Sequence, residues 1–423
     1  MSDETGLSRD ELQVLRTLAR RKMEIAADPV NLERREAWYK LDAGAPDSRP
    51  MVLAEFGSLT DVNKPVTEAS LQCRDPFARE IERGLRHELY MFEVLKEDRV
   101  IEPYYAINWQ VSISDYGIPV VQHRVEGYET TGSRSWDPPI QDIDRDFEKL
   151  RPRTCTVNRE ATRAQQTRLE AIFKDILPVT LRGSFWWSLG LTRVAIELIG
   201  LENLMLLMFD QPEGLHRVMA FLRDDALAVA RWMEKEELLT LNNRNDYIGS
   251  GSTGYTRDLP QPDWKAGMPI RTRDLWVLCE SQETVGVGPD QFTEFIFPYQ
   301  RSVVAEFGKC YYGCCEPVNS RWHILKTLPN LARVSISPWA DEAIMARECA
   351  RRVVYSRKPS PTMISTSRFD EDAIRADLRK TLALAGGCRL EIVMKDIHTL
   401  NNQPERLPRW VELARETIAE QRG

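Results

Sequence analysis

The chain lacks the features that mark membrane-spanning, exported and disulfide-stapled proteins. No apolar run among its 423 residues approaches the roughly 18 residues that a membrane-spanning helix needs. The first residues, MSDETGLSRDELQ, are polar and acidic and contain no apolar signal-peptide core. Eight cysteines spread over so long a chain do not form a disulfide framework. These absences predict a reduced, cytoplasmic, globular protein.

An excess of basic charge is also missing. Lys and Arg number 57 against 64 Asp and Glu, which gives a formal net charge of −7 and argues against nucleic acid as the main partner. No Gly-x-Gly-x-x-Gly motif follows a predicted strand, so a dinucleotide-binding open sheet is disfavoured. We find no internal repeat and no low-complexity tail. With 42% hydrophobic residues, the chain is long enough for one large barrel domain or for two domains.

The N-terminal third contains helices, two predicted strands and a long irregular segment. Ser8 and Glu11 form a capping box that begins a helix, and we expect residues 1–45 to be a helical extension. The catalytic domain is predicted to span residues 46–423. Residues 114–146 show no clear period, and a second polar, Gly-rich loop covers residues 243–272. Loops of this length inside a compact domain are usually functional, so we expect both to cover the pocket.

From residue 158 onward, strands and helices alternate regularly. Such alternation predicts a parallel sheet with right-handed crossovers, and about eight units suggest a single closed (β/α)8 TIM barrel with long loops on its active face. A doubly wound open sheet is the alternative. The predicted strands are Met51–Phe56, Ala106–Ile113, Val179–Leu181, Leu239–Leu241, Leu275–Cys279, 310–312, 332–337, Val353–Ser356 and Arg389–Met394.

Polar residues cluster where four of these strands end. Active sites of barrels lie at the carboxyl ends of the strands, so the clusters predict the site better than any single motif does. Adjacent cysteines cannot easily bridge each other, and in a cytosolic chain ligation or thiol chemistry is the better interpretation. The clusters are Asn242, Asn243, Asn245 and Asp246; Glu280, Gln282 and Glu283; Cys314, Cys315 and Glu316; and Lys395, Asp396 and His398.

Three segments of the second half resemble a known family. They begin WVLCESQETVGVGPDQFTEF, YYGCCEP and GGCRLEIVMKDIHTLNNQPERL, and they are similar to the uroporphyrinogen decarboxylase superfamily, which includes zinc-dependent, corrinoid-linked methyltransferases on (β/α)8 barrels. The resemblance covers residues 180–420. The decarboxylase branch carries an Arg-rich segment after its first strand. Here that place reads MVLAEFGSLTDVNKP, so porphyrinogen decarboxylation is not expected.

The resemblance implies a metal site at the barrel mouth. Cys314 falls on the zinc-ligand cysteine of the methyltransferase branch, while Tyr312 replaces its histidine. His398 falls near a last-strand ligand, Glu280 falls near an acidic residue of the mouth, and Cys315 is a substitute ligand. Zinc binds thiolate, imidazole and carboxylate groups and can keep one position open for substrate.

The resemblance also implies the reaction. It predicts transfer of a methyl group between a small methylated substrate and cobalamin carried on a separate corrinoid protein, because the chain has no corrinoid-binding domain. Superfamily relatives often pair, so a homodimer is expected. The predicted catalytic residues are His398, Glu280 and Tyr312, and the predicted substrate-binding residues are Asn243, Asn245, Asp246, Glu283 and Trp187.

Two other functions remain open. One is a metal-free lyase that acts on a small carboxylate, with His398 or Tyr312 as the general acid and Arg182, Arg193 or Lys395 as charge partners. The other is a binding protein on an enzyme fold, because a fold alone does not give function. The Asn and Asp cluster at 242–246 can also be turn chemistry alone.

Overall fold

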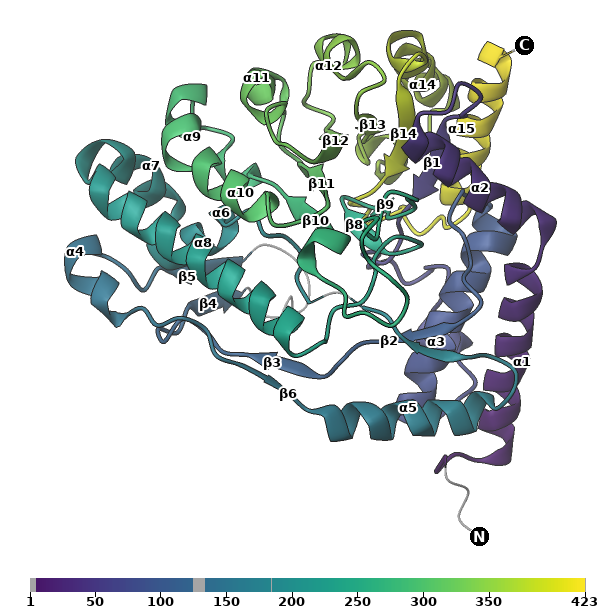
Figure 1. The fold of residues 1–423 in the computed structure, drawn as a ribbon. Helices are drawn as coiled ribbons and strands as arrows, with labels where there is room; N and C mark the ends of the chain where they lie inside the picture. The colour runs from purple at the N-terminus through teal and green to yellow at the C-terminus, as the bar shows by residue number, and fades with distance from the viewer. Residues whose placement is uncertain (1–4, 125–133, 184, 423) are drawn as a thin grey trace.

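A computed structural model describes residues 5–124, 134–183 and 185–422 and shows a mixed α/β fold built on a parallel sheet (Figure 1). Six strands lie in the order β1-β14-β13-β12-β11-β10. Most of their residues are buried and apolar, as expected for parallel strands covered on both faces. The strands are β1 (Met51–Ala54), β10 (Trp276–Cys279), β11 (Lys309–Tyr312), β12 (Leu331–Ile336), β13 (Val354–Arg357) and β14 (Arg389–Met394).

The helices of the second half lie along the outer edge of the sheet in Figure 1. They cover it with a single large apolar core that also includes β10 to β14. Their bounds are α6 (Thr192–Ile199), α7 (Leu201–Asp210), α8 (Pro212–Lys235), α9 (Pro289–Phe295), α10 (Phe297–Val304), α11 (Trp322–Leu325), α12 (Glu342–Cys349), α13 (Thr362–Ser365), α14 (Glu371–Ala385) and α15 (Arg406–Arg422). Of these, α6 to α8 precede β10, and α9 to α15 follow β10 to β14.

The N-terminal helices pack together beside the sheet. The predicted capping box is present, because Ser8 and Glu11 bond to each other's backbone at the start of the first helix. The first, third and fifth helices share a separate apolar cluster with the strand pair β2 (Tyr105–Ile107) and β7 (Val179–Leu181). The helices are α1 (Arg9–Ala26), α2 (Pro29–Ala43), α3 (Pro76–Tyr90) and α5 (Arg159–Phe173), whereas α4 (Ile143–Asp146) lies apart from them and packs against α8.

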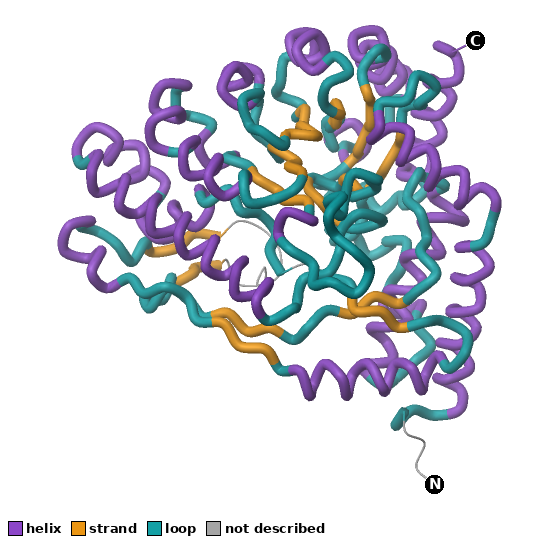
Figure 2. The backbone as a smooth tube through the Cα atoms, viewed as in Figure 1, coloured by secondary structure: helices purple, strands orange, loops and turns teal. Residues whose placement is uncertain are grey.

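Within the described residues, the sheet does not close into a hydrogen-bonded ring. Strands β2 and β7 pair only with each other. Residues 239–241 are predicted as a strand, but the structure has no strand there. Side chains in and beside this segment instead form hydrogen bonds across the gap. Thr240 bonds to the backbone of Gly183, and the Asn242 amide bonds to both the N–H and the C=O of Trp276. In Figure 2, loop segments lie between the six-stranded sheet and the outlying strand pairs.

The two long loops contain more structure than their sequence suggests. The first includes β4 (Val121–Arg124) and β5 (Arg134–Asp137), an antiparallel pair, and beside it β3 (Val111–Ile113) pairs with β6 (Cys155–Val157). Residues 125–133 of this loop lie outside the described part. The second loop folds into a small hairpin, β8 (Tyr247–Gly249) with β9 (Ser252–Thr253).

The β8–β9 hairpin fills the space inside the curved sheet. A Cβ atom at Gly249 would lie 2.6 Å from the Tyr311 ring, and one at Gly251 would lie 2.7 Å from Val393. Both glycines have positive φ angles, 150° and 83°, which other residues rarely adopt. A closed barrel fills its interior with side chains alone. Here the backbone of the hairpin lies in that volume.

Candidate active site

The site lies at the carboxyl ends of four strands. Glu55 follows β1 and Lys395 follows β14, and these ends are adjacent because the Glu55 N–H donates to the Met394 carbonyl at 2.9 Å. Glu280 follows β10, beside the end of β11. Polar groups at the carboxyl edge of a parallel sheet are where α/β enzymes place their chemistry.

The two cysteines after β11 meet a lysine from β14. Cys314 is buried and Cys315 is exposed. The Cys314 Sγ lies 3.6 Å from the Cys315 Sγ and 3.4 Å from the Lys395 Nζ. Two strands separate β11 from β14, roughly 14 Å across a flat sheet, so the curl of the sheet and the long lysine side chain bring these groups together.

The contacts around Cys314 stabilise its thiolate. A hydrogen bond from Cys315 and the charge of Lys395 lower the pKa of Cys314 to about 7, although burial opposes them. Donating that bond, together with burial, raises the pKa of Cys315. Burial lowers the pKa of Lys395, but the charges of Cys314 and Asp396 outweigh it and raise that pKa overall. At neutral pH roughly half of the Cys314 thiol is therefore a thiolate beside the Lys395 ammonium group.

Three carboxyl groups lie beside the thiol pair. Glu316 joins the ends of β10 and β11, because it accepts hydrogen bonds from the N–H groups of Ser281 and Cys314, both at 2.8 Å. Burial, followed by the charges of Glu283 and Glu316, raises the pKa of Glu280 to about 9. Glu280 is therefore a protonated carboxylic acid at neutral pH. A buried acid of this kind can donate a proton to a reacting group.

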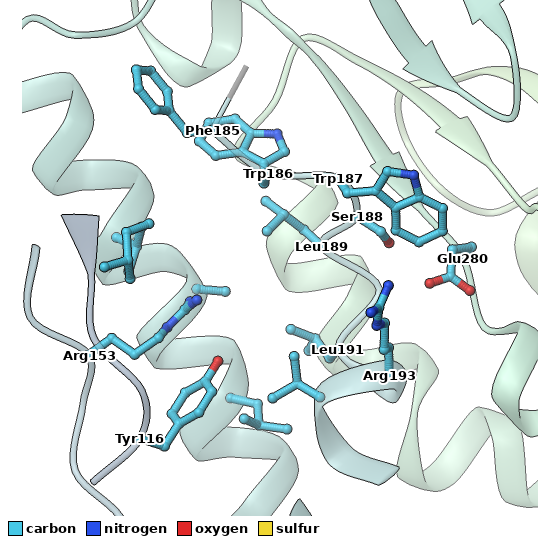
Figure 3. A pocket seen from close by; sticks show the side chains of 15 residues that line it. Tyr116, Arg153, Phe185, Trp186, Trp187, Ser188, Leu189, Leu191, Arg193 and Glu280 are labelled. Atoms are coloured by element: carbon cyan, nitrogen blue, oxygen red, sulfur yellow. The ribbon is translucent and has the colours of Figure 1, made fainter. Parts of the chain in front are cut away.

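Glu280 forms part of the wall of an apolar cavity of about 240 Å³ (Figure 3). In that view the Glu280 carboxyl group lies close to Trp187 and Arg193. Large apolar cavities with a few convergent polar groups are the usual form of small-molecule sites. The lining residues are Ile113, Tyr116, Arg153, Phe185, Trp186, Trp187, Ser188, Leu189, Leu191, Arg193, Val194, Leu222, Ala226, Val229 and Glu280.

The structure leaves two of the predicted catalytic residues outside this site. Tyr312 is the residue of β11 that faces the helices, since successive side chains alternate across a strand, and its hydroxyl donates to Gln300 at 3.0 Å. His398 is exposed, and its backbone carbonyl accepts hydrogen bonds from Thr60. Cys314, Cys315 and Glu280 are brought together, whereas Tyr312 and His398 are not.

The predicted substrate residues divide between two places. Trp187 lines the apolar cavity, and Glu283 accepts a hydrogen bond from Thr192 at 2.8 Å beside the acid cluster. Asn243 and Asp246 bond instead to Arg182, and the Asn243 amide donates to the Leu259 carbonyl, so this pair shapes a turn.

Asn245 lines a different cavity, of about 410 Å³, at the end of β1. Glu55, His87 and Arg99 line it too. Glu55 is a site residue that the sequence prediction missed, because the first strand was extended to Phe56 and so placed Glu55 inside it. An end at Ala54, as observed, puts Glu55 at the same edge as the other clusters.

The residues present do not fit the expected zinc site. Within the described ranges, no group of three or more His, Cys, Asp and Glu residues is placed to hold a metal ion. Structural and catalytic zinc sites need at least three protein ligands. The Lys395 ammonium group also lies against Cys314, where its charge would repel a dication. No step below is derived through a metal.

The chain is similar in fold to a solved structure. It is "methyltransferase from Methanosarcina mazei", which is 12% identical, covers 92% of this chain and 99% of its own, and superimposes with a TM-score of 0.49. At that identity and score the likeness carries no argument about function. No protein-family model and no curated protein matches the chain. Among the described residues, no helix has the length and apolar character to cross a membrane.

Proposed function

We propose that this chain is a methyltransferase that moves a methyl group from a small methylated substrate to cobalamin carried on a separate corrinoid protein. The observation that supports it most is Glu280, a buried carboxylic acid in the wall of an aromatic cavity. Breaking a methyl–heteroatom bond leaves negative charge on the heteroatom. A positioned acid that protonates the heteroatom removes that charge in the transition state.

In this proposal the chain binds the substrate and protonates its heteroatom, and the partner corrinoid protein accepts the methyl group. The apolar body of the substrate occupies the cavity beside Trp187, with its heteroatom facing the Glu280 hydroxyl. The electron pair of the breaking bond stays on the heteroatom, which takes the Glu280 proton. Cobalamin supplies the nucleophilic acceptor. The resemblance of residues 180–420 to corrinoid-linked methyltransferases is the support for that acceptor.

We also infer that the fold is a parallel α/β barrel that has opened. The six-stranded sheet, the β2–β7 pair and residues 239–242 give nine segments that follow one another along the chain, one more than the eight strands of a (β/α)8 barrel. The side-chain bonds of Thr240 and Asn242 stand where ladder hydrogen bonds would run. On this view the β8–β9 hairpin keeps the ring open.

A transfer assay tests the function. The purified chain is mixed with reduced cobalamin and with a panel of methyl ethers, thioethers and methylamines, and formation of methylcobalamin is followed by its absorption spectrum. We expect one class of donor to react. Glu280→Gln should slow the transfer by roughly 10²–10³-fold, because Gln keeps the hydrogen bond but cannot give up a proton.

Glu294→Gln, an exposed carboxylate on α9, is the matched control and should leave the rate unchanged. Wild-type rates in Glu280→Gln would remove Glu280 from the chemistry. Failure of every donor class would count against methyl transfer itself.

One observation favours a lyase as the second candidate. Arg193 lies beside Glu280 in the cavity, where it can hold a substrate carboxylate while the acid protonates the carbanion left by loss of carbon dioxide. Release of carbon dioxide from small carboxylates, without any cobalamin, would favour this reaction over methyl transfer.

A further inference from the structure

The adjacent thiols after β11 have a geometry that the proposed transfer does not use. Their Sγ atoms lie 3.6 Å apart. Two sulfurs bound to one pyramidal atom by bonds of about 2.3 Å, at an angle near 95–100°, lie roughly 3.4–3.5 Å apart. The pair is therefore close to the spacing that one bridging atom requires, and a small movement of the side chains closes the difference.

A direct disulfide fits this pair poorly. Neighbouring Cα atoms are about 3.8 Å apart across a trans peptide, whereas disulfides usually join Cα atoms that are at least about 4.4 Å apart. A bridging atom between the sulfurs avoids that strain. The exposed Cys315 gives a ligand access, and the buried Cys314 is the second point of attachment.

The charges around the pair select against a dication. The Lys395 Nζ lies 3.4 Å from the Cys314 Sγ, and the Asp396 carboxylate lies 3.7 Å from the Cys315 Sγ. A metal dication would meet the ammonium group at contact distance, and within the described residues no group of three or more His, Cys, Asp and Glu side chains is placed to hold it. An uncharged thiophilic centre meets no such repulsion and needs no further protein ligand.

We propose that Cys314 and Cys315 form a chelating dithiol that binds an uncharged trivalent arsenic species, such as arsenous acid or an organoarsenical, by bridging both sulfurs. Two arsenic–sulfur bonds form and two arsenic–oxygen bonds break. The two hydroxyl groups leave as water, with the Cys315 proton and one proton from solvent, and no oxidation state changes. Bound arsenic blocks the mouth of the site, a consequence that rests on the proposed function, whereas the binding does not.

The test uses phenylarsine oxide and the intact mass of the full chain. Wild-type protein should gain one phenylarsenic group, with loss of one water, and should keep it in excess monothiol but release it to a small dithiol. Cys314→Ser and Cys315→Ser should each lose the adduct in monothiol. Cys155→Ser, a half-buried cysteine far from the pair in sequence, is the matched control and should keep it.

Peptide mapping of the wild-type adduct gives a second reading that needs no variant. An adduct on the peptide that contains both Cys314 and Cys315 supports the proposal, and an adduct on any other cysteine overturns it. A monothiol-resistant adduct in Cys315→Ser, or none in wild type, would also overturn it. Stoichiometric zinc retained after dialysis would overturn the argument that the Lys395 charge selects against a dication. These measurements report masses and metal content, so their outcome does not depend on any transfer activity.

Discussion

At the scale of single residues, the site contains two groups whose acidities are shifted in opposite directions. Burial and neighbouring carboxylates raise the pKa of Glu280, while Cys315 and Lys395 lower the pKa of Cys314. Both groups lie at the ends of adjacent strands and are linked through Glu316. Environments that shift the pKa values of two titratable groups in opposite directions are typical of enzyme sites that carry out acid and base chemistry near neutral pH.

The thiolate gives the first residue-scale prediction. Lys395→Met removes the cation beside Cys314, so the pKa of Cys314 should rise by about one unit or more. The measurement is the ultraviolet absorbance of the thiolate as a function of pH, as the difference between each protein and its Cys314→Ser variant. Lys326→Met, an exposed lysine, is the control and should leave the midpoint at about 7. An unchanged midpoint in Lys395→Met would show that Lys395 does not stabilise the thiolate.

At the scale of the elements, the β8–β9 hairpin distinguishes this fold from a closed barrel. Its glycines lie directly against inward-facing side chains of β11 and β14. The hairpin also forms hydrogen bonds at two depths inside the curved sheet. Ser250 accepts a hydrogen bond from Lys395 at the active edge, while Ser252 bonds to Arg333 and Glu391 deeper in the interior.

The hairpin packing predicts a position-specific glycine effect. Gly249→Ala should lower the free energy of unfolding by about 1–3 kcal/mol, because the new methyl group overlaps Tyr311 and Leu278. Chemical denaturation measures it. Gly84→Ala in α3 meets nothing within 4 Å and should instead stabilise the protein by roughly 0.5–1 kcal/mol. Equal effects of the two substitutions would mean that the hairpin is not packed inside the sheet.

Much of the second half of the fold could be predicted from its alternating pattern. The strands after residue 270 lie where they were expected, because buried parallel strands have short apolar runs. Where the prediction was wrong, local geometry prevailed. The apolar pattern of residues 289–307 predicts one helix, but the structure has two, α9 and α10, which meet at Ile296; Pro298 lies in the first turn of α10, where its missing N–H is tolerated. The hairpin was not visible, because its glycines and serines resemble a loop until the sheet around them is known.

The candidate site was predictable in its position and less so in its membership. The strand-end rule expects Glu280, Cys314 and Lys395 at the carboxyl edge of the sheet, and the structure has them there. The rule does not show that Tyr312 faces the helices. In a strand that is buried on both faces, the side chains of both faces are apolar, so the sequence does not indicate which of them face the helices. The corrinoid partner and the homodimer stay predictions, and so does the zinc, although the described residues do not fit it.

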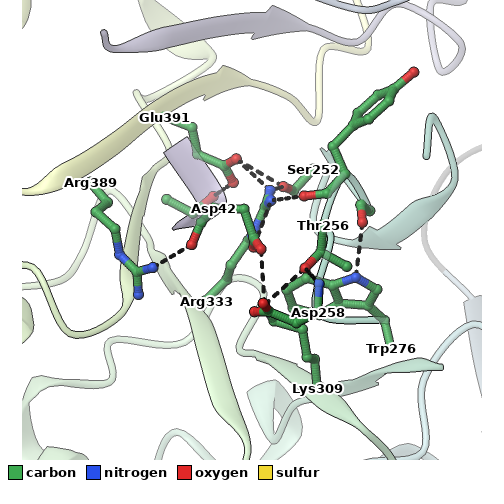
Figure 4. A network of polar contacts seen from close by, with 12 residues as sticks. Asp42, Ser252, Thr256, Asp258, Trp276, Lys309, Arg333, Arg389 and Glu391 are labelled. Atoms are coloured by element: carbon green, nitrogen blue, oxygen red, sulfur yellow. Dashed lines mark hydrogen bonds and ion pairs between the residues drawn. The ribbon is translucent and has the colours of Figure 1, made fainter. Parts of the chain in front are cut away.

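At the scale of the whole molecule, a buried charge network joins the sheet, the hairpin and the N-terminal extension (Figure 4). Arg333 is fully buried and pairs with Glu391 at 3.0 Å and with Asp42 of α2 at 3.5 Å. Its guanidinium also bonds to Ser252 of the hairpin at 2.7 Å. One cation therefore connects three parts of the chain that lie far apart in sequence.

This network predicts a strong and asymmetric response to mutation. Arg333→Met should destabilise the protein by about 3–5 kcal/mol, because it leaves the Glu391 carboxylate buried without its partner. The double variant Arg333→Met, Glu391→Gln should recover much of that loss. Thermal or chemical unfolding measures both. A double variant no more stable than the single one would show that the lost packing of Arg333, and not the unpaired charge, causes the effect.

The protonation state of Glu280 is the central claim, and infrared difference spectroscopy tests it without any substrate. The spectrum of Glu280→Gln is subtracted from that of the wild type across a pH series. We predict a carbonyl band of a protonated carboxylic acid at neutral pH that disappears as the pH rises through about 9. A carboxylate band at neutral pH, without the carbonyl band of the protonated acid, would contradict the account, because an ionised Glu280 has no proton to give a leaving group.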